Sequence, residues 1–135
     1  MSEENKAIVR GFLEKGNREK RTPVELCAPG FTAHIGASPA MDLKAFRQYQ
    51  AKYHAGFSDS SITIEDMVAE GDMVAFRGVV RAVHVAEFIG MPASGKQIAV
   101  PVIGIAQLAD GKIVEWWNSP DRLSWMRQIG AIPSQ

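Results

Sequence analysis

The sequence predicts an α+β protein in which helices pack on one face of a curved antiparallel sheet. Apolar residues recur at helical spacing up to Tyr53, whereas from Ser60 onward they alternate with a period of two residues. One short strand interrupts the helical half, and one more helix follows the strands. Helices gathered before a run of strands are typical of the α+β class, and we expect a single domain over residues 1–135.

The first predicted helix begins near Ser2, whose side chain can cap it, and it has two acidic residues in its first turn. Gly16 and Asn17 are stop signals and predict its end. Its apolar stripe consists of Ile8, Val9, Phe12 and Leu13.

Two further helices are predicted from their start signals. The run Thr22-Pro23-Val24-Glu25 combines a capping box with proline at the first helical position, and Pro29 ends this second helix after a few residues. Asp42 is placed to cap a third helix. One face of that helix carries Phe46, Tyr49 and Tyr53.

Strands are predicted where apolar and polar residues alternate between turn signals such as Asp110-Gly111. They span residues 31–35, 60–68, 73–84, 97–108 and 113–117. The glycines and proline of residues 87–95 indicate a connection. After the last strand, Ser119-Pro120 predicts a final helix with serine as its cap.

Charge and composition exclude several classes of function. The 15 basic and 15 acidic residues balance, and no basic stripe could neutralise phosphates, so we expect no nucleic-acid partner. We expect no membrane partner either, because no apolar run reaches the roughly 20 residues of a membrane helix. The polar N-terminus and the single cysteine, Cys27, favour a cytoplasmic protein. No side chains have metal-ligand spacing, so no metal site is expected.

Several short motifs resemble one family when taken in their order along the chain. The connection from His84 to Lys96 follows the pattern His-x-Gly-Glu-Phe-x-Gly-x-Pro-Pro-Thr-Gly-Lys, with Ala at two of its positions and Ser at a third. The other motifs are Asn5-Lys6, the turn at residues 70–75, the segment 110–115 and Gln128-Ile129-Gly130. Together they resemble the SnoaL-like polyketide cyclases, a branch of the nuclear transport factor 2-like fold, over nearly the whole chain.

The resemblance implies a cone-shaped, curved antiparallel sheet and an aldol-type ring closure without metal or organic cofactor. In that family a carboxylate at the end of the last strand removes a proton alpha to a carbonyl group. Asn118 stands there in this chain, two residues beyond Trp116 on the same face. A carboxamide cannot accept that proton, but it can orient a carbonyl or enolate oxygen. Alternatively, Asn118 only shapes the turn before Pro120.

Three other side chains are candidates for the site. Asp121 could replace the missing base, although it also suits the start of the final helix, and we favour that structural role. His34 lies in the first strand, where the resemblance implies a pocket-lining polar residue, and its ordinary pKa suits proton transfer near neutrality. The alternative is a half-buried histidine without chemical function. His84 either borders the pocket or holds the following loop, and we favour the loop.

The predicted pocket is mainly apolar. The resemblance places two inward polar positions at Val102 and Gly104, and neither has a hydrogen-bonding side chain. Aromatic residues either line the pocket or fill the core, and the candidates are Trp116, Phe46, Tyr49 and Tyr53. Arg77 and Arg81 share one face of their strand, which we expect to be the outer face.

Two functional hypotheses remain. In the first, the chain is a SnoaL-like cyclase or isomerase for a small hydrophobic carbonyl compound, with His34 as acid or base and Asn118 polarising an oxygen. In the second, it is a small-molecule binding protein of the same fold that lacks the base. An epoxide hydrolase is less well supported, because no second inward carboxylate lies near Asn118. In every case we expect a homodimer through the open sheet face, because Ile113 and Trp117 would otherwise be exposed.

Overall fold

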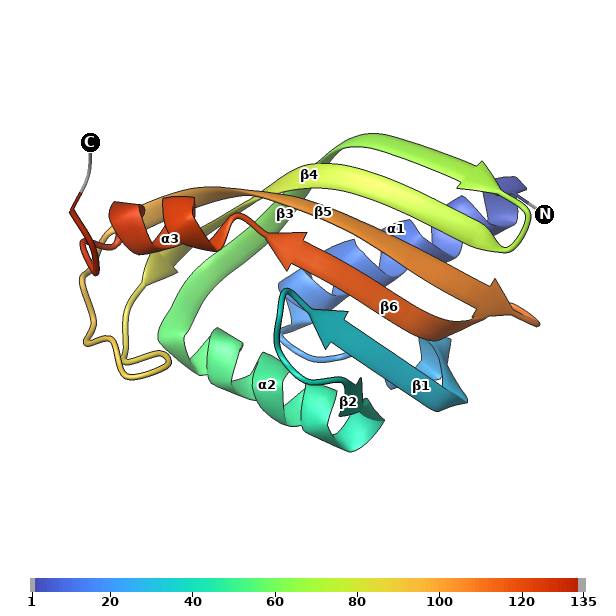
Figure 1. The fold of residues 1–135 in the computed structure, drawn as a ribbon, viewed down its shortest axis with the longest axis horizontal. Helices are drawn as coiled ribbons and strands as arrows, with labels where there is room; N and C mark the ends of the chain where they lie inside the picture. Colours follow the sequence, from blue (N-terminus) through green and yellow to red (C-terminus); the bar gives the residue numbers. More distant parts are fainter. Residues whose placement is uncertain (1, 134–135) are drawn as a thin grey trace.

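The computed structural model describes residues 2–133, which form three α-helices and a curved, unclosed six-stranded sheet, and this confirms the predicted α+β class (Figure 1). The helices are α1 (Ser2–Glu19), α2 (Leu43–Gly56) and α3 (Arg122–Gln128), and one 3₁₀ turn, η1, spans Val24–Leu26. The strands are β1 (Cys27–Ile35), β2 (Met41–Asp42), β3 (Phe57–Glu70), β4 (Met73–His84), β5 (Gln97–Ala109) and β6 (Lys112–Pro120).

The strand order in the sheet is β2-β1-β6-β5-β4-β3. The four long strands from β3 to β6 pair antiparallel with their neighbours in chain order, as predicted. Strand β1 instead pairs parallel with β6, and this pairing brings Ile35 beside Asn118. The ends of β1 and β6 therefore meet at one place, although about 80 residues separate them in the sequence.

The core lies between the inner face of the sheet and the helices. In β5 every second residue from Ile98 to Leu108 is buried, so this strand turns one face inward along its whole length. Helix α1 runs along that face, and α2 lies beside β1 and β2 (Figure 1). Phe12 of α1 packs on Trp116 of β6 with ring centroids 4.7 Å apart. Burial of these rings fixes α1 against the sheet.

Two helix boundaries differ from the prediction. Helix α1 continues past Gly16 and Asn17 to Glu19, because the Asn17 side chain donates to the Leu13 carbonyl within the helix instead of ending it. Lys20, with φ of 57°, follows the last residue of the helix. Since α1 already includes Ser2, the predicted cap at that residue is wrong, and the cap position lies outside the described residues. The second helix is only the turn η1, because β1 already begins at Cys27.

Other features agree with the sequence. Asp42 caps α2, accepting a hydrogen bond from the Ala45 amide at 2.8 Å. Arg77 lies on the outer face, where it forms ion pairs with Glu65 and Asp66. Within residues 2–133 no helix is long and apolar enough to cross a membrane.

Candidate functional site

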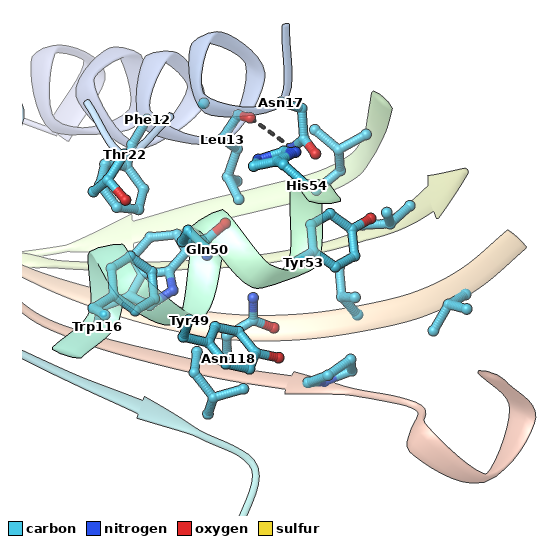
Figure 2. A pocket seen from close by; sticks show the side chains of 18 of the residues that line it. Phe12, Leu13, Asn17, Thr22, Tyr49, Gln50, Tyr53, His54, Trp116 and Asn118 are labelled. Carbon is cyan, nitrogen blue, oxygen red and sulfur yellow. Dashed lines mark hydrogen bonds between the residues drawn. The ribbon is translucent and has the colours of Figure 1, made fainter. Parts of the chain in front are cut away.

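A partly open cavity of about 150 Å³ lies between the inner face of the sheet and helices α1 and α2 (Figure 2). Cavities of roughly this size hold one benzene molecule. The enclosed part therefore accommodates about one six-membered ring, and a larger ligand must extend through the opening. The apolar wall includes Phe12, Phe46, Ile62, Val80, Val102 and Trp116.

Asn118 projects into this cavity from the end of β6 (Figure 2). Its backbone carbonyl accepts a hydrogen bond from the Gly36 amide at 2.9 Å, which joins the end of β6 to the end of β1. The side-chain oxygen Oδ1 is buried and has no hydrogen-bond partner among the described residues. An unsatisfied buried acceptor costs about 1–3 kcal/mol, so a ligand that donates a hydrogen bond to Oδ1 would remove a real penalty.

His34 lies outside the cavity. Its neighbours Ala33 and Ile35 are buried in the core, so the alternation of the strand turns His34 to the outer face. There its Nε2 lies 2.6 Å from a carboxylate oxygen of Glu115, and its ring stacks on Trp117. The expectation that His34 lines the pocket is therefore wrong, and a ligand inside the cavity would not meet it.

Asp121 has the structural role favoured from the sequence. Its carboxylate caps α3 by accepting a hydrogen bond from the Ser124 amide at 3.0 Å, and it does not line the cavity. The predicted cap, Ser119, is wrong, because β6 continues through it to Pro120. The Asp121 amide donates a hydrogen bond to the Pro101 carbonyl of β5. Asp121 is the single residue between the end of β6 and the start of α3.

His84 and Gly104 do not line the cavity either. His84 is fully buried, and its Nδ1 accepts a hydrogen bond from the Ser94 amide at 3.2 Å, so it holds the connection between β4 and β5. Gly104 faces inward, but a Cβ there would overlap the Phe76 ring and lie 2.5 Å from the Trp117 carbonyl oxygen. The expectation that Gly104 contacts the ligand is wrong, because the Phe76 ring occupies the space beside it.

The remaining predicted wall residues do line the cavity: Trp116, Phe46, Tyr49, Tyr53 and Val102. Trp116 and Phe46 are 1% exposed and belong to the core as well as to the wall. The core and wall interpretations of these rings were therefore not exclusive.

A hydrogen-bond chain fixes one side of the cavity. The Ser60 hydroxyl donates to Asn17 Oδ1 at 2.6 Å, and the Asn17 amide group donates to the Leu13 carbonyl. Because Ser60 has one proton, the Tyr53 hydroxyl, 2.9 Å away, must donate to Ser60. Burial raises the pKa of Tyr53 to about 12, so this side chain stays a neutral phenol. Its oxygen can still accept a hydrogen bond from a ligand.

His54 of α2 is a cavity residue that the sequence analysis missed. Its Nδ1 is buried and has no hydrogen-bond partner within the described residues. Burial, with a smaller contribution from the charge of Lys20, lowers the pKa of His54 below its ordinary value. Its imidazole is therefore neutral at pH 7 and can accept a proton. In Figure 2 it lies toward α1, whereas Asn118 lies toward β6.

No aspartate or glutamate is among the described residues that line the cavity. Of the side chains in the lining, His54 is thus the one whose ordinary pKa lies near neutrality. Within residues 2–133, no group of three or more His, Cys, Asp or Glu side chains is arranged to hold a metal ion.

Helical spacing could have found His54. The predicted stripe of α2 contains Phe46, Tyr49 and Tyr53. Gln50 and His54 each follow one of these tyrosines directly and lie on the same side of the helix. The prediction named only the aromatic residues of this face, although its polar residues line the cavity as well.

Comparisons with known proteins agree with this geometry. The sequence profile of the SnoaL-like polyketide cyclases matches residues 7–129. A proposed SnoaL-like polyketide cyclase from Jannaschia sp. CCS1 superposes with a TM-score of 0.87 at 24% identity, covering 98% of this chain and 95% of that one. IdmH, a proposed polyketide cyclase from Streptomyces antibioticus, superposes with a TM-score of 0.79 at 28% identity, covering 93% and 98%.

A proposed hydroxylase, AclR from Streptomyces galilaeus, has the same fold with a TM-score of 0.87 at 21% identity, covering 98% of this chain and 84% of that one. The fold thus occurs in relatives that are named for different reactions. Among curated proteins, no sequence matches this chain significantly. The profile covers most of the chain, and the strand order and cavity fit it: the chain belongs to the SnoaL-like polyketide cyclase family.

Proposed function

We propose that this protein is a cyclase or isomerase that acts on a small, largely hydrophobic carbonyl compound held in the cavity. The observation that carries the proposal is the Asn118 side chain at the end of β6, which enters a mainly apolar cavity and whose Oδ1 has no hydrogen-bond partner among the described residues. Membership of the SnoaL-like family supports the reaction class.

In the proposed step, the neutral imidazole of His54 accepts the proton alpha to the carbonyl. The electron pair of that C–H bond becomes the enolate, whose oxygen accepts a hydrogen bond from the Asn118 amide group. The enolate carbon then attacks a second carbonyl in an aldol closure, and the His54 imidazolium returns its proton to the alkoxide that forms. In an isomerisation, the imidazolium instead returns the proton to another carbon of the extended enolate. Apolar surroundings strengthen the hydrogen bond to the developing charge. His54 thus takes the role first assigned to His34.

A second candidate function is binding without catalysis. The absence of a carboxylate from the described cavity lining supports it, because the resemblance to the family implies a carboxylate as the base. Asn118 would then only orient a bound carbonyl compound.

The test uses thermal unfolding with single-ring ketones, hydroxy-ketones and epoxides, followed by product analysis of every compound that binds. A ligand specific for the folded state stabilises it by about 2.7 kcal/mol at 100 times its Kd. We expect a hydroxy-ketone to stabilise the protein and to exchange its alpha protons faster with enzyme than without. Binding without exchange would contradict the enzyme and support the binding protein, and no binding by any compound would contradict both.

A further inference from the structure

Arg122 brings a positive charge to the same end of the cavity as Asn118. It is the first residue of α3 and belongs to the cavity lining. Its Nη2 lies 3.8 Å from the point that a Cβ of Gly36 would occupy, so the guanidinium rests against this glycine. The Gly36 amide is bonded to the Asn118 backbone carbonyl. The guanidinium and the Asn118 amide therefore flank the same junction of β1 and β6.

This guanidinium has no carboxylate partner among residues 2–133. The other arginine of the lining, Arg21, forms ion pairs with Glu19 and Glu25 and is thereby neutralised. Burial raises the pKa of Tyr49 above its ordinary value, and the charge of Arg122 opposes part of this rise. Tyr49 remains a phenol that can donate a hydrogen bond. This end of the cavity thus offers a cation and neutral donors without a compensating anion.

The buried oxygen of Asn118 requires a hydrogen-bond donor on the ligand, in addition to the anionic group that Arg122 requires. Oδ1 can only accept a hydrogen bond, and nothing in the described structure donates to it. A ligand that satisfies both groups carries an anionic oxygen group for Arg122 and a hydroxyl for Asn118. Guanidinium groups bind carboxylates through two parallel hydrogen bonds, so a carboxylate is the anion that suits Arg122 best.

We propose that the ligand of this cavity is a single-ring hydroxy acid, with its carboxylate on Arg122 and its hydroxyl donating to Asn118. This inference goes beyond the proposed reaction: it concerns what the same cavity binds, and it requires only that the cavity takes a small ring compound. The ring lies against the apolar part of the cavity wall, and the volume of the cavity matches one six-membered ring.

The test measures Kd by NMR titration for four probes that differ in one group each. They are 3-hydroxybenzoate, 3-methoxybenzoate, 3-hydroxybenzamide and the neutral ketone 3-hydroxyacetophenone. We expect 3-hydroxybenzoate to bind most tightly, because the second probe loses the hydroxyl donor and the last two lose the charge.

Arg122→Gln should weaken the binding of 3-hydroxybenzoate by about tenfold and that of 3-hydroxybenzamide by less than about twofold, as expected for a charge-assisted hydrogen bond. Arg10→Gln is the matched control, since Arg10 is exposed on α1, lies outside the cavity lining and pairs with Glu14. It should leave all four affinities unchanged.

The outcomes separate this inference from the proposed function. The hydroxy-acid proposal is overturned if the ketone binds as tightly as the acid. It is also overturned if Arg122→Gln leaves the affinity for the acid unchanged. Neither result contradicts the proposal that the cavity binds a carbonyl compound. Failure of all four probes to bind also overturns the hydroxy-acid proposal, whereas the proposed function is decided by the wider series of ketones, hydroxy-ketones and epoxides. If Arg10→Gln weakens the binding of the acid as strongly as Arg122→Gln does, the effect is one of overall charge. That result would also overturn the proposal.

Discussion

At the scale of single residues, the amide at position 118, where the resemblance implies a carboxylate, decides what the cavity can do. The amide keeps the hydrogen-bonding geometry at the end of β6 but removes the proton acceptor. Gly36 and Ile35 hold the backbone of this strand end in place. The scaffold should therefore regain a base when the carboxylate is restored.

The first prediction concerns that restoration. Asn118→Asp should raise the rate of alpha-proton exchange in an activated ketone such as phenylacetone by at least about 100-fold, the lower end for general-base catalysis. The buried position of Oδ1 supports this, because desolvation raises the pKa of a carboxylate there and makes it a stronger base. Exchange is followed by proton NMR in deuterated buffer. Asn118→Leu is the control, and an equal rate in the two variants would show that position 118 is not the base position.

The second prediction follows from the lowered pKa of His54. Between its ordinary pKa of 6.5 and its lower folded value, the unfolded chain binds more protons than the folded chain. The stability that His54 contributes is therefore complete above pH 6.5 and is lost as the pH falls through the folded pKa. His54→Gln should flatten the loss of unfolding free energy below pH 6.5, measured by urea unfolding at several pH values. An unchanged slope would contradict the lowered pKa.

At the scale of elements, the close packing of β4, β5 and β6 depends on Gly104. A Cβ at this position would meet the Trp117 carbonyl oxygen at 2.5 Å, and a backbone atom cannot move aside cheaply. The Phe76 ring on the other side stacks on Trp116, which forms the cavity wall. Gly104 thus positions the wall without contacting a ligand.

The third prediction tests this packing. Gly104→Ala should lower the free energy of unfolding by about 1–3 kcal/mol, the usual cost of overpacking a core. Gly30→Ala is the matched control, because a Cβ at Gly30 meets nothing within 4 Å and the residue lies in an exposed part of β1. The two variants are compared by denaturant unfolding. Equal stabilities would refute the close contact at Gly104.

Some helices and strands could be predicted from the sequence, and one strand pairing could not. Alternation predicted the four long strands because each is half buried, and Asp42 predicted the start of α2 because capping is a local interaction. The parallel pairing of β1 with β6 could not be predicted, since it joins segments about 80 residues apart. That pairing brings Gly36 to Asn118, and Gly36 lies against the guanidinium of Arg122. The candidate site was therefore predicted at Asn118 and missed at Arg122 and His54.

At the scale of the whole molecule, the outer face of the sheet remains partly uncovered. Ile103 is 61% exposed and Ile105 is 39% exposed, and Trp117 lies beside Ile105 in the register. Ile113, first expected on this face, is fully buried in the core, so it is not part of the exposed surface. The patch formed by Ile103, Ile105 and Trp117 is the apolar surface that a partner would cover.

The fourth prediction is that this patch joins two copies of the chain. The zero net charge removes long-range repulsion between copies, and burial of two such faces is favourable. Light scattering after gel filtration should give the mass of a dimer for the native chain and of a monomer for Ile103→Glu. Val68→Glu is the control, since Val68 is also exposed but lies on β3 at the edge of the sheet. A native monomer would contradict the dimer.

The central claim is that the cavity beneath α2 is a ligand site oriented by Asn118. The most direct measurement is a titration of ¹⁵N-labelled protein with 3-hydroxyacetophenone, comparing the native chain with Asn118→Leu. We expect the Asn118 side-chain amide signal to shift and the variant to bind about fivefold more weakly, the equivalent of one neutral hydrogen bond. Signal changes confined to the outer face around His34 and Trp117, or an affinity that the variant leaves unchanged, would contradict this claim.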